Sequence, residues 1–128
     1  MRLLLDTHII IWSVSAPEQL SKKTQQYMID AETMYVSAAS IWEIGIKLKL
    51  GKLQLNLAAF VREINNIGIQ PLAITWRHAQ CTQKLPIYHK DPFDRMLVAQ
   101  AMSEPLILLT NDAVLTQYSE LVRHVDSL

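Results

Sequence analysis

The sequence is short of cysteine and of long apolar runs. Cys81 is its one cysteine, so no intramolecular disulfide can form. No apolar run approaches the roughly 18 residues that a membrane-spanning helix needs. The apolar run at residues 3–5 is interrupted at once by Asp6, which weighs against a signal peptide. These absences predict a cytoplasmic protein without a membrane segment.

The chain also lacks an excess of charge of either sign. Twelve Lys and Arg balance twelve Asp and Glu, so the formal net charge is zero. Bulk charge therefore gives no reason to expect binding to a nucleic acid. A polyanion would have to be held by a local basic patch or by bound cations.

Composition and hydrophobic pattern indicate one α/β domain, residues 1–128. Half of the 128 residues are hydrophobic and 19% are charged, which excludes a disordered chain. Short apolar runs alternate with amphipathic segments, and this alternation predicts a parallel sheet covered by helices on both faces. We expect strands at residues 3–5, 34–36, 69–74, 106–109 and 121–125, with Pro71 marking an edge strand. We expect helices at residues 9–12, 18–30, 37–50, 57–67, 75–85 and 92–104, and a short one after Asp112.

The helix expected at residues 92–104 carries an acid in an unusual place. Asp91 can cap this helix, and Pro92 suits its first position because the N–H that proline lacks would have no partner there. At about 100° per residue, Asp94 lies at the centre of an apolar stripe formed by Leu97, Val98 and Ala101. A carboxylate on a buried face needs a partner, and a metal ion is one of the few good ones.

Three further acids are expected at one edge of the sheet. Asp6 directly follows the first strand, Asp112 follows the fourth, and Glu43 lies near the start of the helix after the second. Open parallel sheets bind ligands outside the carboxyl ends of their strands. Asp94 would have to be delivered there by the loop at residues 86–90. Carboxylates clustered without cysteine or grouped histidine indicate hard cations, Mg²⁺ or Mn²⁺.

Each acid also has an ordinary structural explanation. Asp6 and Asp112 could cap the helices behind them. Glu43 and Lys47 have the spacing of a surface ion pair. Asp6 and Asp94, however, are both expected to be buried, and two neighbouring buried carboxylates repel unless cations neutralise them. This favours the metal site.

Four short motifs follow one another along the chain. They are Leu-Leu-Asp6-Thr7-His8, Ser-Ile-Trp-Glu43-Ile, Asp91-Pro-Phe-Asp94-Arg95-Met-Leu-Val-Ala-Gln-Ala and Leu-Leu-Thr110-Asn-Asp112. Together they resemble the PIN-domain ribonucleases, and most of all the VapC-like toxins of bacterial type II toxin–antitoxin systems. The resemblance implies a three-layer α/β/α domain whose five-stranded parallel sheet has the order 3-2-1-4-5. It also implies that one or two Mg²⁺ or Mn²⁺ ions are bound by an acidic quartet: Asp6, Glu43, Asp94 and Asp112.

The resemblance further implies an activity and partners. Such proteins hydrolyse single-stranded RNA with a metal-activated water, leaving a 3′-hydroxyl and a 5′-phosphate. They usually form homodimers, and a small antitoxin silences them by placing its C-terminal segment in the active-site groove. The helix at residues 37–50 is apolar on two sides, with Trp42 and Ile46 on the second side, which is compatible with such a partner surface.

Further residues are candidates to support the site or to contact RNA phosphate: Thr7, Thr110, Arg95 and Lys47. Arg95 has the best position, directly after Asp94, although a structural bridge to Asp91 or Asp94 is an equal alternative. No pair of histidines has metal-ligand spacing, and His8 is the one histidine expected near the site.

Three other functions are open on the sequence alone. A phosphoryl-transfer enzyme could use Asp6 as its nucleophile, but phosphatases of that kind carry a second Asp two residues later, where this chain has His8. A PIN-like module without catalysis would only bind RNA or protein, although all four acids are present. The third alternative is an RNA-processing nuclease outside a toxin–antitoxin system.

Overall fold

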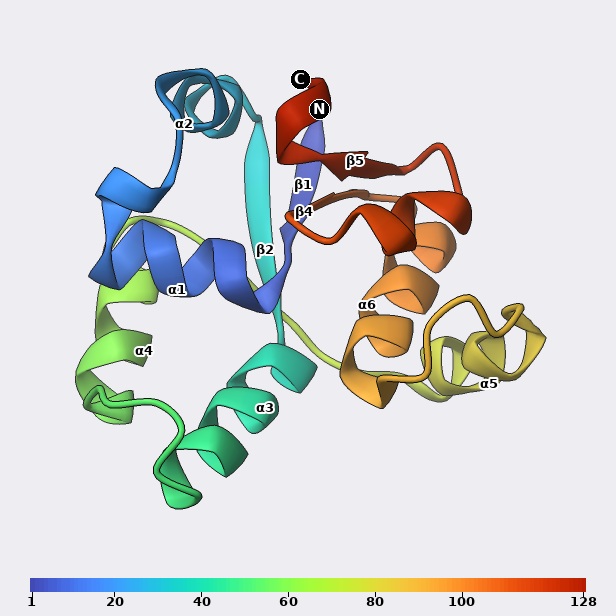
Figure 1. Cartoon of the computed structure of the whole chain (residues 1–128), viewed down its shortest axis with the longest axis horizontal. Helices are drawn as coiled ribbons and strands as arrows, with labels where there is room; N and C mark the ends of the chain where they lie inside the picture. Colours follow the sequence, from blue (N-terminus) through green and yellow to red (C-terminus); the bar gives the residue numbers. More distant parts are fainter.

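Five parallel strands form the central sheet, in the order β3-β2-β1-β4-β5. The computed structural model describes all of residues 1–128 and confirms both the α/β/α class and the expected strand order (Figure 1). Pro71 lies in an edge strand, as predicted, because an edge position leaves one side of the backbone without ladder partners. The strands are β1 (Arg2–Leu5), β2 (Thr33–Ser37), β3 (Gln70–Leu72), β4 (Ile107–Thr110) and β5 (Val122–His124).

The central strand β1 divides the apolar core in two. Successive side chains of a strand point to opposite faces of the sheet. Leu3 and Leu5 therefore belong to one apolar cluster and Leu4 to the other, and all three are fully buried. Burial on both faces explains why this strand reads as a continuous apolar run.

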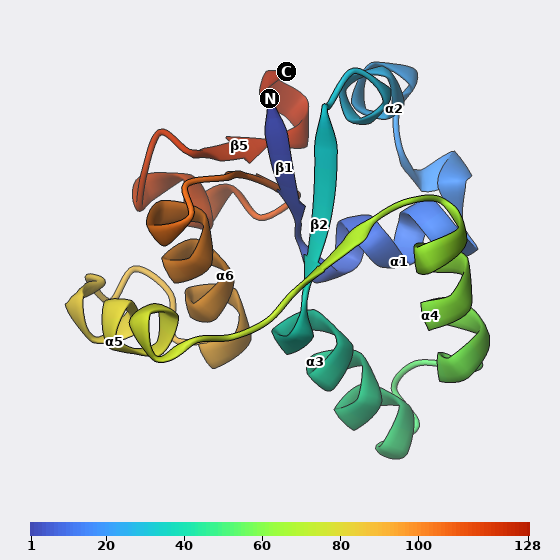
Figure 2. The same cartoon turned by 180° about the vertical axis from the view of Figure 1, so that it is seen from behind.

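Helices cover both faces of the sheet (Figures 1 and 2). The cluster around Leu3 and Leu5 is closed by α1 (Thr7–Ser15), α2 (Lys22–Ile29), α3 (Ala38–Lys49) and α4 (Leu57–Asn66). The cluster around Leu4 is closed by α6 (Pro92–Ser103), which packs against α5 (Trp76–Lys84). Figure 2 shows the long connection through β3 that carries the chain across the sheet from α4 to α5. No helix is long and apolar enough to span a bilayer.

The segment at residues 18–30 differs from the single helix that we expected. A short 3₁₀ helix, η1 (Pro17–Gln19), comes first, and α2 starts separately after Ser21. The Ser21 hydroxyl accepts a hydrogen bond from the Thr24 amide at 3.0 Å, and this cap fixes the start of a new helix. The first helix, expected at residues 9–12, spans Thr7–Ser15. The last strand, expected at residues 121–125, spans Val122–His124 and is followed by the 3₁₀ helix η3 (Val125–Ser127).

Candidate metal centre

A polar pocket of about 360 Å³ lies at the carboxyl edge of the sheet. It brings together all four acids that the sequence singled out, although they come from four different elements. Both termini lie at the other end of β1 (Figure 1), so the chain ends are far from this pocket. The residues that line it are Asp6, Thr7, His8, Glu43, Lys47, Asp91, Asp94, Asn111, Asp112 and Ala113.

Asp6 is the most deeply buried of the four acids that line the pocket. It follows β1 directly and is only 3% exposed. Asp6 occupies the N-cap position of α1, where the His8 backbone favours its charged form, but its side chain makes no close capping hydrogen bond. Instead, its Oδ2 accepts a hydrogen bond from the hydroxyl of Thr110 at the end of β4. Burial raises the pKa of the Asp6 carboxyl, and the bond from Thr110 opposes that rise.

Glu43 enters the pocket from the first half of α3. Its Oε2 lies 3.0 Å from Lys47 Nζ, so the expected i,i+4 ion pair is formed. The pair is not an ordinary surface pair, because Glu43 is only 7% exposed. Its other oxygen, Oε1, is buried and has no hydrogen-bond partner. A buried carboxylate oxygen without a partner is costly, and a cation would satisfy it.

The start of α6 is fixed by Asp91. The Oδ1 atom of Asp91 accepts hydrogen bonds from the amides of Phe93 at 2.9 Å and Asp94 at 3.0 Å, so Asp91 is the predicted cap. The apolar stripe is also confirmed, because Leu97, Val98 and Ala101 are fully buried. The Asp94 side chain keeps 20% of its exposure, because the first turn of the helix opens into the pocket. Asp94 is thus less buried than its place on the stripe predicted.

The electrostatic environment of Asp94 is strongly unfavourable to its charge. Burial is the largest cause that raises the pKa of this carboxyl, followed by the negative charges of Asp6, Asp91, Glu43 and Asp112. Together these effects raise the pKa of Asp94 to about 7. The acids around Asp94 disfavour its charged form, and a divalent ion in the pocket would offset that repulsion.

The sequence missed His89, which reaches the pocket from the loop before α6. Its Nε2 lies 3.1 Å from Asp112 Oδ2 and 3.5 Å from Asp94 Oδ2. These three side chains can each offer one ligand atom within 4.8 Å of the others. His8, which was expected near the site, also lines the pocket. Histidine spacing gave no signal for His89, because the path of the loop decides where its ring lies.

Asp112 has two contacts at the pocket rim. Its Oδ1 accepts a hydrogen bond from the Val114 amide at 3.0 Å, so it does cap the short helix η2 (Ala113–Gln117). Its Oδ2 is the oxygen that faces His89. The two oxygens of Asp112 therefore have different partners, and the Asp112 amide donates to the Thr110 hydroxyl at 3.0 Å.

Among the four supporting residues, three lie at the site and one does not. Lys47 and Thr7 line the pocket, and the Thr7 hydroxyl donates to the Ser40 hydroxyl at 2.9 Å, which joins α1 to α3. Thr110 contacts Asp6, as described above. Arg95 is not free for RNA phosphate and forms no bridge to an acid. Its guanidinium donates to the Tyr118 hydroxyl and to four backbone carbonyls, those of Thr82, Leu85, Pro86 and His89.

These features define an α/β domain with an acidic, cation-accepting pocket at the carboxyl edge of its sheet. The donors are carboxylate oxygens, the ligands that hard divalent ions prefer, and one of them is buried without a partner. The sequence profile of the PIN domain matches residues 3–121, and the chain belongs to that family.

Individual relatives agree with this assignment. The chain is 28% identical over 116 residues to Ribonuclease VapC22 of Mycobacterium tuberculosis, and the match covers 85% of each chain. Its fold is similar to that of VapBC2 from Rickettsia felis bound to a DNA fragment from its promoter, with a TM-score of 0.70, 11% identity and 97% of each chain covered. It is also similar to DNA-bound VapBC from Salmonella typhimurium, with a TM-score of 0.68, 15% identity and coverage of 97% of this chain and 96% of the other.

Proposed function

We propose that this protein is a divalent-metal-dependent endoribonuclease that hydrolyses single-stranded RNA as the toxin of a toxin–antitoxin pair. One observation carries the proposal: acids from four elements meet in a single pocket, and a buried oxygen of Glu43 there has no partner. Membership of the PIN family and similarity to a VapC ribonuclease support the reaction class. Similarity in fold to chains of VapBC complexes supports the biological role.

The four acids Asp6, Glu43, Asp94 and Asp112 would hold one or two Mg²⁺ or Mn²⁺ ions. Bound there, such an ion supplies a nucleophilic hydroxide and neutralises charge on the scissile phosphate and leaving oxygen. The protein's own residues prepare the pocket for this chemistry. Thr110 orients the Asp6 carboxylate, Asp91 fixes the helix turn that carries Asp94, and Lys47 places a cation beside Glu43 at the pocket wall.

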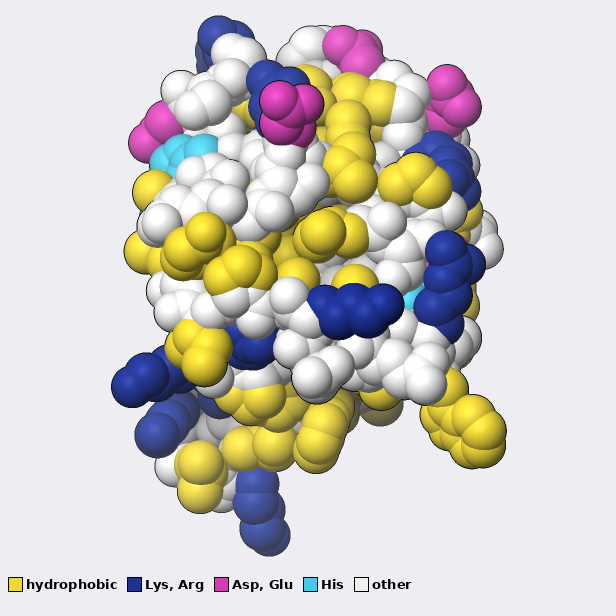
Figure 3. Space-filling model, turned by 90° about the vertical axis from the view of Figure 1, so that its right-hand side faces the viewer, with side chains coloured by type: hydrophobic (Ala, Val, Ile, Leu, Met, Phe, Trp, Pro, Cys, Tyr) yellow, Lys and Arg dark blue, Asp and Glu magenta, His cyan; other side chains and the backbone are white.

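RNA needs positive charge beyond the metal site, because the net charge of the chain is zero. Figure 3 shows Asp and Glu side chains mainly near the top of one face, whereas Lys and Arg side chains are spread from its top to its bottom among hydrophobic ones. Lys47 and Lys49 on α3 add cations beside the pocket and beside the neighbouring groove. These two lysines supply local positive charge that suits a polyanion although the chain as a whole is neutral.

The activity is tested directly by incubating single-stranded RNA with the protein and Mg²⁺ or Mn²⁺. Cleavage should depend on the ion, stop on chelation and be lost in Asp94→Asn. Asp126→Asn is the matched control, because Asp126 lies on η3 with a side chain that is 87% exposed. Equal cleavage by wild type and Asp94→Asn would contradict the proposal. A phosphoryl group trapped covalently on Asp6 would instead favour the phosphoryl-transfer alternative.

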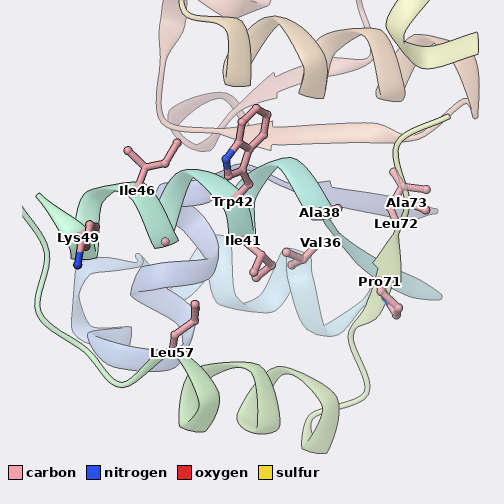
Figure 4. A pocket seen from close by; sticks show the side chains of 11 residues that line it. Val36, Ala38, Ile41, Trp42, Ile46, Lys49, Leu57, Pro71, Leu72 and Ala73 are labelled. Carbon is pink, nitrogen blue, oxygen red and sulfur yellow. The ribbon is translucent and has the colours of Figure 1, made fainter. Parts of the chain in front are cut away.

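We propose that the antitoxin binds in an apolar groove of about 780 Å³. Eight of its eleven lining residues are hydrophobic. Most of the lining comes from α3 and from residues 71–73 at and after the end of β3 (Figure 4). Trp42 on α3 is 63% exposed and directly precedes Glu43 in the chain. A segment that covers this tryptophan would therefore lie next to the metal centre and could block access of RNA.

The partner proposal predicts that a peptide from a short reading frame immediately upstream of the gene binds this groove and inhibits cleavage. Trp42→Arg should weaken binding, measured by calorimetry, while RNA cleavage without the peptide stays at the wild-type rate. Sedimentation of the free protein tests the expected homodimer. Equal peptide affinity for wild type and Trp42→Arg would place the antitoxin elsewhere.

A further inference from the structure

The backbone and ring of His89 are fixed by hydrogen bonds on several sides. Its amide donates to the Tyr118 hydroxyl at 2.9 Å, and its carbonyl accepts from Arg95 Nη1 at 3.3 Å. Its ring Nδ1 accepts from the amide of Asp91 at 3.0 Å. The ring therefore has one orientation, in which Nε2 faces the metal centre.

The bond from Asp91 also determines which ring nitrogen carries the hydrogen. A backbone amide can only donate, so Nδ1 must present its lone pair. The neutral ring then carries its hydrogen on Nε2, the atom that lies 3.1 Å from Asp112 Oδ2 and 3.5 Å from Asp94 Oδ2. A nitrogen that carries hydrogen has no lone pair for a metal ion. The geometry that groups His89 with two acids thus disfavours it as a ligand.

We propose that His89 is a positioning residue whose protonated Nε2, 3.1 Å from Asp112 Oδ2 and 3.5 Å from Asp94 Oδ2, holds these carboxylates electrostatically for the metal ion without binding the ion itself. The inference rests on the proposed metal site. Polar groups beside metal ligands help to hold them in place and tune their basicity. A polarised ring N–H beside two carboxylates also offsets their mutual repulsion.

Arg95 helps to hold His89 in place. It directly follows Asp94, and its guanidinium donates to the His89 carbonyl. The same guanidinium donates at 3.2 Å to the Tyr118 hydroxyl, which in turn accepts a hydrogen bond from the His89 amide. One arginine thus joins the loop that carries His89 to the helix that carries Asp94. This contact explains why a residue with a suitable position for binding phosphate is instead occupied by the protein's own backbone.

Two variants of the full chain separate the two nitrogens of the ring. In His89→Asn the amide oxygen can replace Nδ1 as the acceptor for Asp91, but nothing replaces Nε2–H. In His89→Gln the longer side chain can bring an N–H toward the two carboxylates. We expect His89→Asn to weaken Mn²⁺ binding about 10–100-fold, and His89→Gln by less than about tenfold, in calorimetry. Equal affinities of wild type and His89→Asn, or equal losses in the two variants, would overturn the proposal.

Spectroscopy distinguishes positioning from direct ligation. Pulsed electron paramagnetic resonance of the Mn²⁺-loaded protein should show no strong coupling to a directly bonded ¹⁴N. Such a coupling, present in wild type and absent from His89→Asn, would make His89 a ligand. In the metal-free protein near pH 8, where an ordinary imidazole is neutral, the ¹⁵N shifts of the ring should show Nε2 protonated. A ring protonated at Nδ1 would overturn the inference.

The two tests also separate this inference from the proposed function. If wild type bound no Mn²⁺, the metal site would be wrong and the positioning role would fall with it. If wild type bound Mn²⁺ with His89 protonated at Nδ1, the metal site would stand and only the role of His89 would be wrong.

Discussion

The hydroxyl of Thr110 donates a hydrogen bond to the carboxylate of Asp6, joining the ends of the neighbouring strands β4 and β1 beneath the metal centre. Asp6 is almost fully buried, so this donor stabilises its ionised form in an environment that otherwise disfavours charge. Thr110→Val keeps the shape of the side chain and removes the hydroxyl. We expect it to raise the pKa of Asp6 further and to weaken Mn²⁺ binding about 10–100-fold.

Thr110→Ser is the matched control for that experiment. It keeps the hydroxyl and should bind Mn²⁺ within a few-fold of wild type in calorimetry. Wild-type affinity in Thr110→Val would show that Asp6 is oriented without this bond, or that Asp6 is not a ligand.

Asp91 and Asp94 should have separable roles although they are three residues apart. Asp91→Ala removes the cap of α6 and should lower the free energy of unfolding by roughly 0.5–2 kcal/mol, measured by urea denaturation. RNA cleavage should be largely retained, because the Asp91 Oδ1 is engaged with the helix amides. Asp91→Asn should restore most of the stability, since Asn caps helices as well as Asp. A folded Asp91→Ala protein without any cleavage would contradict this division.

The raised pKa of Asp94 predicts how the stability of the metal-free protein depends on pH. The carboxyl has a pKa of about 7 in the folded chain, against an ordinary value of 3.8. Between these values the folded state binds more protons than the unfolded state, so the contribution of Asp94 to stability is fully present below the lower value. It is lost as pH rises toward 7, with a slope of up to about 1.4 kcal/mol per pH unit.

Denaturation of wild type and Asp94→Asn in chelator, at several pH values, isolates this contribution. Asp94→Asn should become progressively more stable relative to wild type between about pH 4 and 7, and the difference should be constant above that window. Saturating Mn²⁺ should remove the trend in wild type, because the ion replaces the proton on Asp94. A difference that does not vary with pH would show that Asp94 ionises normally.

Local patterns account for what the sequence predicted well. The cap, the first-turn proline and the buried stripe of α6 all lie within one helix, so spacing along the chain is sufficient to find them. The strands at the centre of the sheet, β1 and β4, could be found from their apolar runs alone. Asp6, Glu43 and Asp112 could be grouped because the carboxyl ends of parallel strands share one edge, whereas strand ends alone did not place Asp94 there.

The loop before α6 shows where such prediction ends. His89 and Arg95 both lie close in sequence to Asp94, yet their partners include Asp112, Thr82 and Tyr118, which belong to other elements. The path of a loop is set by such tertiary contacts and not by periodicity. A histidine was therefore missed at the site, and an arginine was assigned a contact with RNA that the fold does not leave free.

Arg95 provides a test of that correction, because a structural arginine and a phosphate-binding arginine respond differently to lysine. Arg95→Lys keeps the charge but loses the planar fork that reaches several carbonyls at once. If Arg95 fixes the loop, amide hydrogen exchange at residues 86–90 should rise and cleavage should fall in this variant, at every salt concentration. If Arg95 only attracted phosphate, Arg95→Lys would exchange like wild type and retain most activity, whereas Arg95→Met would lose activity most strongly at low salt.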